Sequence, residues 1–286
     1  MSSCPAHAIL QFMQQGNTGT FSIRPLDDSS QDELHSFCAC LCPGEAELAS
    51  VSPVKLAWYE KQRSHGFRVL LAFSGQTPLG MIQYGPVESS WLEGKGCMVV
   101  YCIWIPPKKR LGGIQARSRG IGTALLAAAE EDARRSGSGG MAAWGLALPL
   151  WMRAAWFRKH GYRVVERQGM MRLLYKTFES GSIPPRWRSP AGQPAKHGSG
   201  PVRLTVLSNG WCPAMNMVMQ RARDVASEFG NAVSVDEIST ADPAVMIRLG
   251  ESDMLYIDDR PVSPAPPVSP ARLRRLLARA IKRHTG

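Results

Sequence analysis

Short runs of apolar and β-branched residues alternate along the front of the chain with segments whose apolar residues recur at helical spacing. The runs predict strands at residues 20–24, 67–73, 79–84, 97–105, 141–148, 162–167 and 171–178. The helical spacing predicts helices at residues 31–40, 54–64, 121–136 and 150–159. This order predicts a mixed α/β sheet that includes an antiparallel hairpin around residues 74–78.

The same two patterns return after residue 201. They predict strands at residues 202–207, 233–238, 254–257 and 261–262, and helices at residues 215–229, 243–249 and 271–283. Residues 179–201, in between, are dominated by Pro, Gly, Ser and basic residues and have no apolar period. We therefore expect a first domain at 1–180, a linker at 181–200 and a small three-layer α/β domain at 201–286.

The chain has 286 residues and a formal net charge of +11. Much of the positive charge falls in residues 108–119, in the linker and in residues 272–284. The first group suits a polyanionic cofactor, whereas the last has the pattern of the solvated face of a terminal helix. Because no base-stacking aromatic residues are interleaved with these basic runs, we do not expect a nucleic-acid partner.

The apolar pattern does not indicate a membrane segment or a secretory signal. The longest apolar stretch, residues 141–152, is too short to cross a bilayer and contains a glycine and a proline. The first fifteen residues lack the basic flank and apolar core of a signal peptide. Seven cysteines, an odd number, show no obvious disulfide framework. These features favour a cytoplasmic protein with reduced thiols and no membrane attachment.

A basic, glycine-containing loop lies between a predicted buried strand and a long helix. This arrangement presents unpaired backbone N–H groups to an anion. Gly120 and Gly122 would let a phosphate approach the backbone closely, and Arg117 and Arg119 add positive charge. The loop lacks the G-x-G-x-x-G spacing of a Rossmann turn, so a different diphosphate-containing cofactor is favoured.

The spacing R-x-x-G-x-G at Arg117, Gly120 and Gly122 resembles the acetyl-coenzyme A signature of the GNAT superfamily. Residues 154–167, a helix followed by Gly-Tyr and a strand, resemble a later segment of the same family. The resemblance covers most of residues 20–178 and implies a GNAT mixed-sheet domain in an acetyl-coenzyme A-dependent N-acetyltransferase. Its acceptor would be a small-molecule or protein amine, and the oligomeric state stays open, with a homodimer as one option.

The same resemblance implies how the cofactor is held. Residues 101–105 would run beside the pantetheine arm and diverge from the strand at 142–148. The acceptor would enter from the side of the hairpin and the two front helices. The cofactor-binding residues would be Ile103, Trp104, Ile105, Arg117, Arg119, Gly120, Ile121, Gly122 and Thr123.

The sequence does not identify the general acid, because this chain departs from the family at two positions. Phe157 stands where many GNAT enzymes have a tyrosine, and Leu150 where an asparagine is common. Transfer to an amine needs an acid to protonate the leaving thiolate. Tyr101 and Tyr162 are the candidates, and each also fits the role of a packed strand aromatic.

The sequence does not identify the general base either. Glu88 follows the hairpin, and His160 ends a helix, where the helix dipole also favours a cation. Cys102 would place a thiol near the thioester, although a cysteine in a buried strand is also ordinary core.

Cys38, Cys40 and Cys42 form a CxCxC pattern that differs from the C-x-x-C of structural zinc sites. On one helix their thiols would point to different faces. We expect no metal site. The three cysteines could be small buried residues, or they could form a soft-metal or reactive-thiol site.

Residues 209–216 resemble the active-site turn of thioredoxin-fold proteins, with Cys212 at the first-cysteine position. A thiol at a helix N-terminus has a lowered pKa. Met215 replaces the second cysteine, which excludes an intramolecular dithiol cycle, and Ser252 and Asp253 stand where the fold usually has a proline. The fusion resembles acetyltransferases with a C-terminal YoaP-like, thioredoxin-like domain. Two alternative functions remain: a thiol or soft-metal protein that uses Cys212, and a non-catalytic acyl-coenzyme A sensor.

Overall fold

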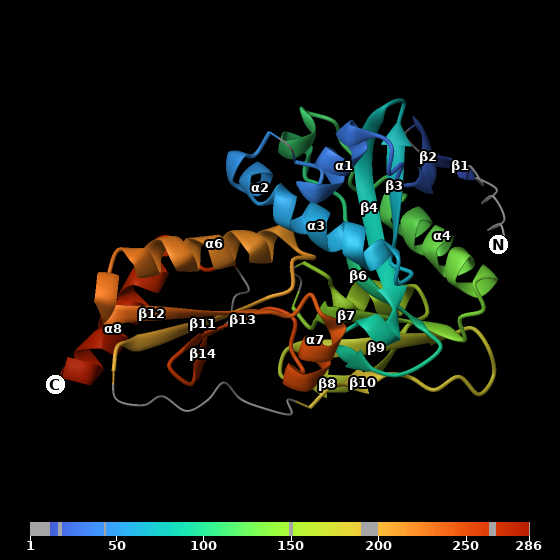
Figure 1. Ribbon diagram of the computed structural model, residues 1–286. Helices are drawn as coiled ribbons and strands as arrows, with labels where there is room; N and C mark the ends of the chain where they lie inside the picture. Colours follow the sequence, from blue (N-terminus) through green and yellow to red (C-terminus); the bar gives the residue numbers. More distant parts are fainter. Residues whose placement is uncertain are drawn as a thin grey trace, which may run out of the picture. The chain divides into compact units, whose positions relative to one another are not determined.

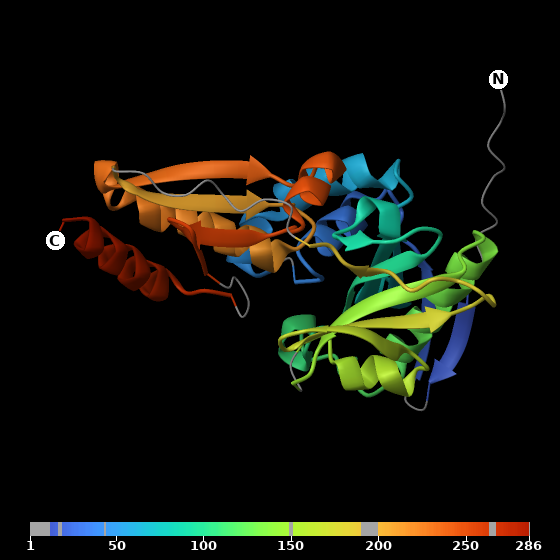
Figure 2. The same cartoon turned by 90° about the horizontal axis from the view of Figure 1, so that it is seen from below.

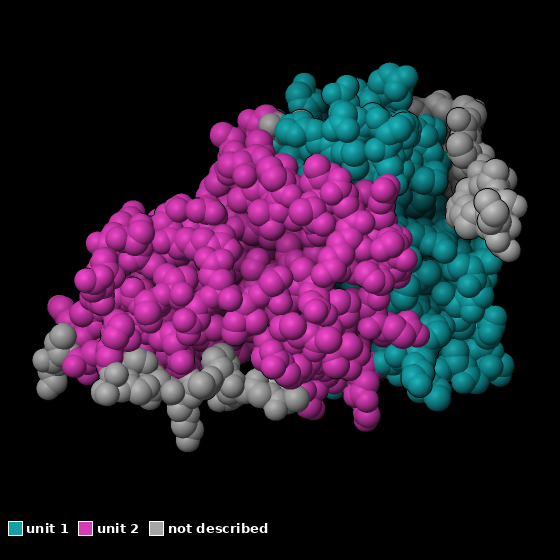
Figure 3. Space-filling model, viewed as in Figure 1, with its two compact units in different colours: residues 1–42, 66–86, 94–185 teal, residues 43–65, 87–93, 186–286 magenta. Residues whose placement is uncertain are grey.

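The computed structural model describes residues 12–16, 19–42, 44–148, 151–189, 200–262 and 267–285. Contacts divide the chain into two compact units (Figure 3). Unit 1 comprises residues 1–42, 66–86 and 94–185, and unit 2 comprises residues 43–65, 87–93 and 186–286. Among the described residues, no helix is both long enough and apolar enough to cross a membrane.

An eight-stranded mixed sheet forms the centre of unit 1 (Figure 1). Its strands, in spatial order, are β1 (Phe12–Gly16), β2 (Gly19–Pro25), β3 (Arg68–Ser74), β4 (Thr77–Pro86), β6 (Met98–Trp104), β7 (Gly140–Leu146), β9 (Met171–Thr177) and β8 (Arg163–Gln168). Only the β6–β7 pair is parallel, and the other neighbours are antiparallel. The predicted mixed sheet and its β3–β4 hairpin are confirmed.

The long helix α4 (Ile121–Arg135) packs on this sheet through a stripe of small and branched residues. A partly buried polar contact fixes it further: Asp132 accepts hydrogen bonds from the Tyr84 hydroxyl and from Arg68, each at 2.6 Å. Burial and the nearby Asp132 carboxylate raise the pKa of Tyr84, so the phenol stays a donor. These contacts hold α4, and therefore its N-terminus, on β3 and β4.

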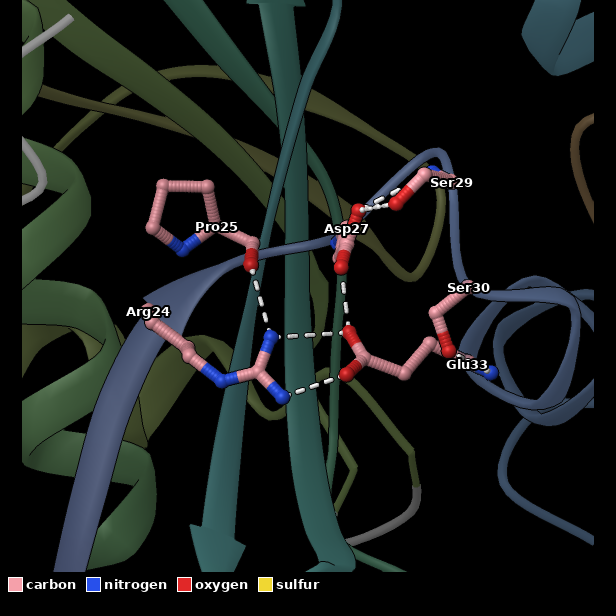
Figure 4. Close-up of polar contacts among 6 residues, drawn as sticks. All are labelled: Arg24, Pro25, Asp27, Ser29, Ser30 and Glu33. Atoms are coloured by element: carbon pink, nitrogen blue, oxygen red, sulfur yellow. Dashed lines mark hydrogen bonds and ion pairs between the residues drawn. The ribbon is translucent and has the colours of Figure 1, made fainter.

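Helix α1 (Gln31–Cys38) starts with a capping arrangement that ties it to β2 (Figure 4). Ser30 Oγ accepts from the Glu33 N–H at 3.4 Å, and the Glu33 carboxylate binds the Arg24 guanidinium in a bidentate pair. The same carboxylate accepts from the Asp27 N–H at 3.1 Å. The Ser30 hydroxyl and the Glu33 carboxylate thus accept hydrogen bonds from backbone N–H groups in and just before the first turn of α1.

Two predicted helices have different bounds. Helix α1 ends before residue 40, because Cys40 and Leu41 have φ values of +54° and +59° that a continuing α-helix cannot contain. Only Cys38 of the CxCxC pattern is helical, so the placement of all three thiols on one helix is wrong. The helix predicted at 150–159 begins at Ala154 (α5, Ala154–Lys159), after an extended Arg153, and Leu150 lies outside the described residues.

Unit 2 contains a four-stranded sheet (Figure 2). Its order is β12 (Val233–Ser239), β11 (Val202–Ser208), β13 (Met254–Ile257) and β14 (Arg260–Val262), with β11 and β12 parallel and the other pairs antiparallel. Helices α6 (Pro213–Ser227) and α8 (Pro270–Thr285) contact each other and β11. Helix α7 (Pro243–Leu249) follows β12. Val206, Val218, Leu255 and Leu277 belong to the apolar core that results.

Unit 2 also includes two segments from the first half of the chain. The short helix α2 (Ala46–Ser50), which was not predicted, is held by a bidentate ion pair between Glu47 and Arg221, with one contact at 2.7 Å. Helix α3 (Ser52–Arg63) donates from Gln62 Nε2 to the Ala241 carbonyl at 3.1 Å. In the second segment β5 (Leu92–Glu93) pairs with β10 (Arg186–Trp187).

Candidate cofactor site

The loop between β6 and α4 ends in an open helix N-terminus. Gly120 is the residue before the first turn of α4 and has a φ of +78°, which favours glycine. The first turn has no side-chain cap. A Cβ added at Gly120 would meet nothing within 4 Å, and one at Gly122 would only reach the Trp156 ring at 3.5 Å. The first N–H groups of α4 are therefore available to an anion.

Two arginines flank this N-terminus. Arg117 Nε donates to the Ile105 carbonyl at 3.0 Å, which ties the loop back to the end of β6. Arg119 is half-buried, and its Nε has no hydrogen-bond partner in the part of the chain that the structure describes. Neither guanidinium pairs with a carboxylate among the described residues. Their positive charge is therefore not neutralised within the described protein.

A neighbouring contact was not apparent in the sequence. His160, at the end of α5, contacts the Trp156 carbonyl through Nδ1 at 2.8 Å and the Thr123 hydroxyl through Nε2 at 3.0 Å. In the neutral ring these contacts fit a proton on Nδ1 and an accepting Nε2. The contact joins α5 to the first turn of α4, so Trp156 and His160 belong to the surroundings of the loop. The i, i+4 spacing of residues 156 and 160 is the sequence feature from which their proximity on one helix face could have been predicted.

The parallel strand pair β6–β7 of unit 1 opens into a split. Strands β6 and β7 pair at just three positions, from Met98 with Met141 to Val100 with Ala143, although both strands continue. Ile103 and Trp104 pair with β4 but lie on the part of β6 that has no β7 partner, and Ile105 follows them. The Trp144 indole N–H crosses the split and donates to the Tyr101 carbonyl at 3.0 Å.

Residues 32–162 match the Acetyltransferase (GNAT) family. This part of the chain is a GNAT acetyltransferase domain. The predicted GNAT fold and the predicted enzyme class are thereby confirmed. No curated protein matches the chain in sequence.

Several solved structures are similar to the GNAT domain. PaiA N-acetyltransferase from Thermoplasma acidophilum, in complex with coenzyme A, is 15% identical over 55% of this chain and 99% of that chain, with a TM-score of 0.40. YncA from Salmonella typhimurium, with its cofactor acetyl-CoA, is 17% identical over 57% and 97%, with a TM-score of 0.41. Ribosomal-protein-alanine N-acetyltransferase from Brucella melitensis is 20% identical over 55% and 99%, with a TM-score of 0.40.

The two tyrosines considered for acid catalysis are both buried in the GNAT domain. The Tyr101 ring packs edge-on against Phe67 with 5.2 Å between ring centres, and burial raises the pKa of its phenol. Tyr162 packs against Phe157. Burial and the nearby Glu130 carboxylate raise the pKa of Tyr162. An ordinary phenol is already protonated at neutral pH, so the raised pKa values rule out a role as base and make each tyrosine a weaker proton donor.

Cys102 lies on β6 beside the split. It is 4% exposed and is paired with Gln83 of β4, whose buried Oε1 has no hydrogen-bond partner. Directly paired residues of an antiparallel ladder point to the same face, so the thiol and the amide share one face of the sheet. Glu88, by contrast, is exposed in a short 3-10 helix (η1, Val87–Ser89) that belongs to unit 2.

The turn around Cys212 in unit 2 is closed, in the sense that its thiol is buried and donors of the turn are hydrogen-bonded within the protein. Cys212 is 5% exposed and precedes α6, and its carbonyl accepts from the Met215 and Asn216 N–H groups. Asp253 accepts from the Asn209 N–H at 3.1 Å and from the Trp211 indole at 3.0 Å. Burial raises the pKa of Asp253 to about 6, although these hydrogen bonds oppose the shift.

Cysteines do not gather into a metal site in the part of the chain that the structure describes. No group of three or more His, Cys, Asp or Glu side chains there is placed to hold an ion. The described cysteines form no disulfides, and Cys42 Sγ contacts the Cys40 carbonyl.

Unit 2 also has a cavity of about 380 Å³ between α3 and the carboxyl ends of β11 and β12. Its lining includes Trp58, Lys61, Ser208 and Ser239, and Cys212 does not line it.

Proposed function

We propose that this protein transfers the acetyl group of acetyl-coenzyme A directly to an amine of a small molecule or a protein. The observation that carries the proposal is the open first turn of α4, with Gly120 in the left-handed region and two arginines that pair with no carboxylate in the described residues. A diphosphate supplies the negative charge and the acceptor atoms that such a turn lacks.

The rest of the cofactor would follow β6. The N–H groups of Ile121, Gly122 and Thr123 would bind the pyrophosphate, together with Arg117 and Arg119. Backbone groups of Ile103, Trp104 and Ile105 would bind the pantetheine amides inside the split. This path supports the proposal because β6 lacks a β7 partner over that stretch.

Direct transfer needs three events at the split. The neutral amine nitrogen attacks the thioester carbonyl carbon, the carbon–sulfur bond breaks, and the ammonium proton leaves the nitrogen. The leaving thiolate takes up a proton. Tyr101 and Tyr162 are the proposed acids, because a phenol is protonated at neutral pH and can donate, although burial raises both pKa values and makes each a weaker donor. Cys102 stays a candidate for contact with the thioester.

For the C-terminal part we propose a thioredoxin-like, YoaP-like domain at 201–286, joined by the 181–200 linker to a GNAT domain at 1–180, of which residues 43–65 and 87–93 belong to unit 2. The strand order β12-β11-β13-β14, with one parallel pair followed by an antiparallel hairpin, supports this assignment. Met215 leaves Cys212 without a second cysteine in the turn, so any function of this thiol would not be a dithiol cycle.

The double variant Gly120→Ala/Gly122→Ala tests the proposed site. The Cβ at position 120 enters open space above the helix end, where the phosphate would approach. We expect acetyl-coenzyme A affinity, measured by titration calorimetry, to fall at least about tenfold while the fold persists. Gly137→Ala is the matched control, because Gly137 has the same φ of +78° and equally empty surroundings at the other end of α4. Equal affinity in the double variant and the parent would contradict the proposal.

A further inference from the structure

The terminal helix α8 carries a charge that the rest of its domain does not share. Residues 201–269 contain five Lys and Arg but nine Asp and Glu. Helix α8 contains six Lys and Arg and no acidic residue. A basic helix on an otherwise acidic domain concentrates positive potential in one place, which general solubility does not require.

The charges of α8 occupy one side of the helix. Leu273, Leu277 and Ala280 are 0% exposed and face the core of unit 2. At about 100° per residue, five exposed cationic residues fall within an arc of about 100° on the other side and extend over about 16 Å. This cationic stripe consists of Arg272, Arg275, Arg279, Lys282 and Arg283.

No described side chain neutralises the stripe. Arg274, outside the stripe, is held by Glu228 in a bidentate ion pair at 2.6 and 2.7 Å. His284 contacts Asp258 at 3.2 Å. In contrast, none of the five stripe side chains has an ion pair or a side-chain hydrogen bond within the described residues. Domain folding therefore uses Arg274 and His284 but leaves the stripe free for an external polyanion.

We propose that the cationic stripe of α8 binds the phosphate backbone of duplex DNA without reading its sequence. Four of its five residues are arginine, whose guanidinium binds phosphate in a bidentate manner. A duplex presents one negative charge per ~1.7 Å of axis, a density that a linear row of cations matches. This proposal revises the expectation from the sequence that there is no nucleic-acid partner. The absence of stacking aromatics argues against single strands but does not weaken a contact made only with phosphates.

Other polyanions fit the stripe less well. Helices that bind membranes insert an apolar face, whereas the apolar face of α8 is already buried in the domain core. Protein interfaces have an apolar or aromatic centre, which the exposed side of α8 lacks over its described side chains. Duplex RNA binders add contacts to 2′-hydroxyls, but the described exposed side of α8 offers no hydroxyl or amide side chain.

The test measures binding of the full-length protein to a fluorescein-labelled mixed-sequence DNA duplex of about 30 base pairs by anisotropy at several salt concentrations. If all five cations contact phosphates, log K should fall against log salt with a slope of about −4.5, which is about 500-fold between about 50 and 200 mM. The double variant Arg275→Gln/Arg279→Gln should lower the slope to about −2.7 and bind more weakly at low salt.

The matched control is Arg223→Gln/Arg274→Gln, which removes the same charge from two arginines that are already paired with Glu237 and Glu228. We expect its DNA affinity and salt slope to stay close to those of the parent. Helix content by circular dichroism shows whether each variant is folded. Equal losses in the stripe variant and the control would overturn the proposal, because net charge alone would then explain binding.

Two further measurements distinguish duplex DNA from duplex RNA and from an anionic membrane as the partner. Competition with a duplex RNA of the same length should be weaker than competition with unlabelled DNA. Vesicles with about one third phosphatidylserine should bind no better than neutral vesicles at about 150 mM salt. Preference for RNA or for the anionic vesicles would overturn the assignment to DNA, as would absence of any DNA binding at about 50 mM salt.

Discussion

Two helices of this protein follow a strand and a glycine-containing turn, and their N-termini differ in what they leave accessible. Helix α4 begins after Gly120, without a side-chain cap and with open space around the glycine. Helix α6 begins after Cys212, and Pro213 at its first position has no N–H to offer. The same local pattern therefore leaves an open helix N-terminus in one case and a packed turn in the other.

The difference arises from the neighbours of each turn. A Cβ at Gly210, ahead of α6, would lie 3.1 Å from Trp58 Cβ, and Trp211 is stacked on Trp91. Asp253 occupies the Asn209 N–H and the Trp211 indole. The turn before α4 instead has arginines and unfilled space. A helix N-terminus binds an external anion only where the fold does not already cover it.

The same substitution should destabilise the two turns to different extents. Gly210 has a φ of +106° and contacts Trp58, so Gly210→Ala should lower the free energy of unfolding by about 2–3 kcal/mol. Gly120→Ala, in open space, should lower it by only about 1 kcal/mol. Urea denaturation of both variants measures this directly. Equal stability losses would mean that the α6 turn is no more tightly packed than the α4 turn.

Arg119 should matter for ligand affinity and little for stability. Its Nε is buried without a partner, so an anion at the α4 N-terminus would satisfy it. We expect Arg119→Gln to weaken acetyl-coenzyme A binding about tenfold. Arg167→Gln, an exposed site on β8, is the charge-matched control and should bind normally. A similar loss in both variants would indicate long-range electrostatics in place of a local contact.

The closed turn should respond to pH through Asp253. Its pKa is about 6 in the folded protein against a usual value of 3.8. Between these values the folded state holds a proton that the unfolded chain has lost, so this group lowers stability as pH rises from about 4 to about 6. Relative to Asp253→Asn, the parent should lose about 1–2 kcal/mol of unfolding free energy between about pH 4.5 and 7. Parallel pH profiles of parent and variant in denaturant titrations would show that Asp253 has an ordinary pKa.

The smallest effect is expected at Cys212. The thiol is buried, and serine is a good residue before a helix, so Cys212→Ser should change stability by less than about 1 kcal/mol. Coenzyme A release with an accepted amine should stay within about twofold of the parent. A large loss of turnover would assign the thiol of the closed turn a part in the reaction.

Much of the GNAT domain could be predicted, because its strands are continuous apolar runs and its loop contains glycines with a distinct spacing. The run at 97–105 corresponds to β6, and Gly120 does precede α4 with a positive φ. The end of α1 could not be predicted, since the left-handed backbone of Cys40 and Leu41 has no signal in residue type. Trp144 was missed as well, because its hydrogen bond to Tyr101 depends on where two strands diverge.

The sequence by itself determined the order of the elements, the position of the basic glycine loop and the amphipathic character of α8, because periodicity and turn chemistry are local properties. Tertiary structure decided which helix N-terminus is open, which arginines are paired and which early segments join unit 2. Glu47 and Arg221 are 174 positions apart, yet they form an ion pair in unit 2. Such contacts depend on how distant faces are brought together, and no pattern within a short window of sequence contains that information.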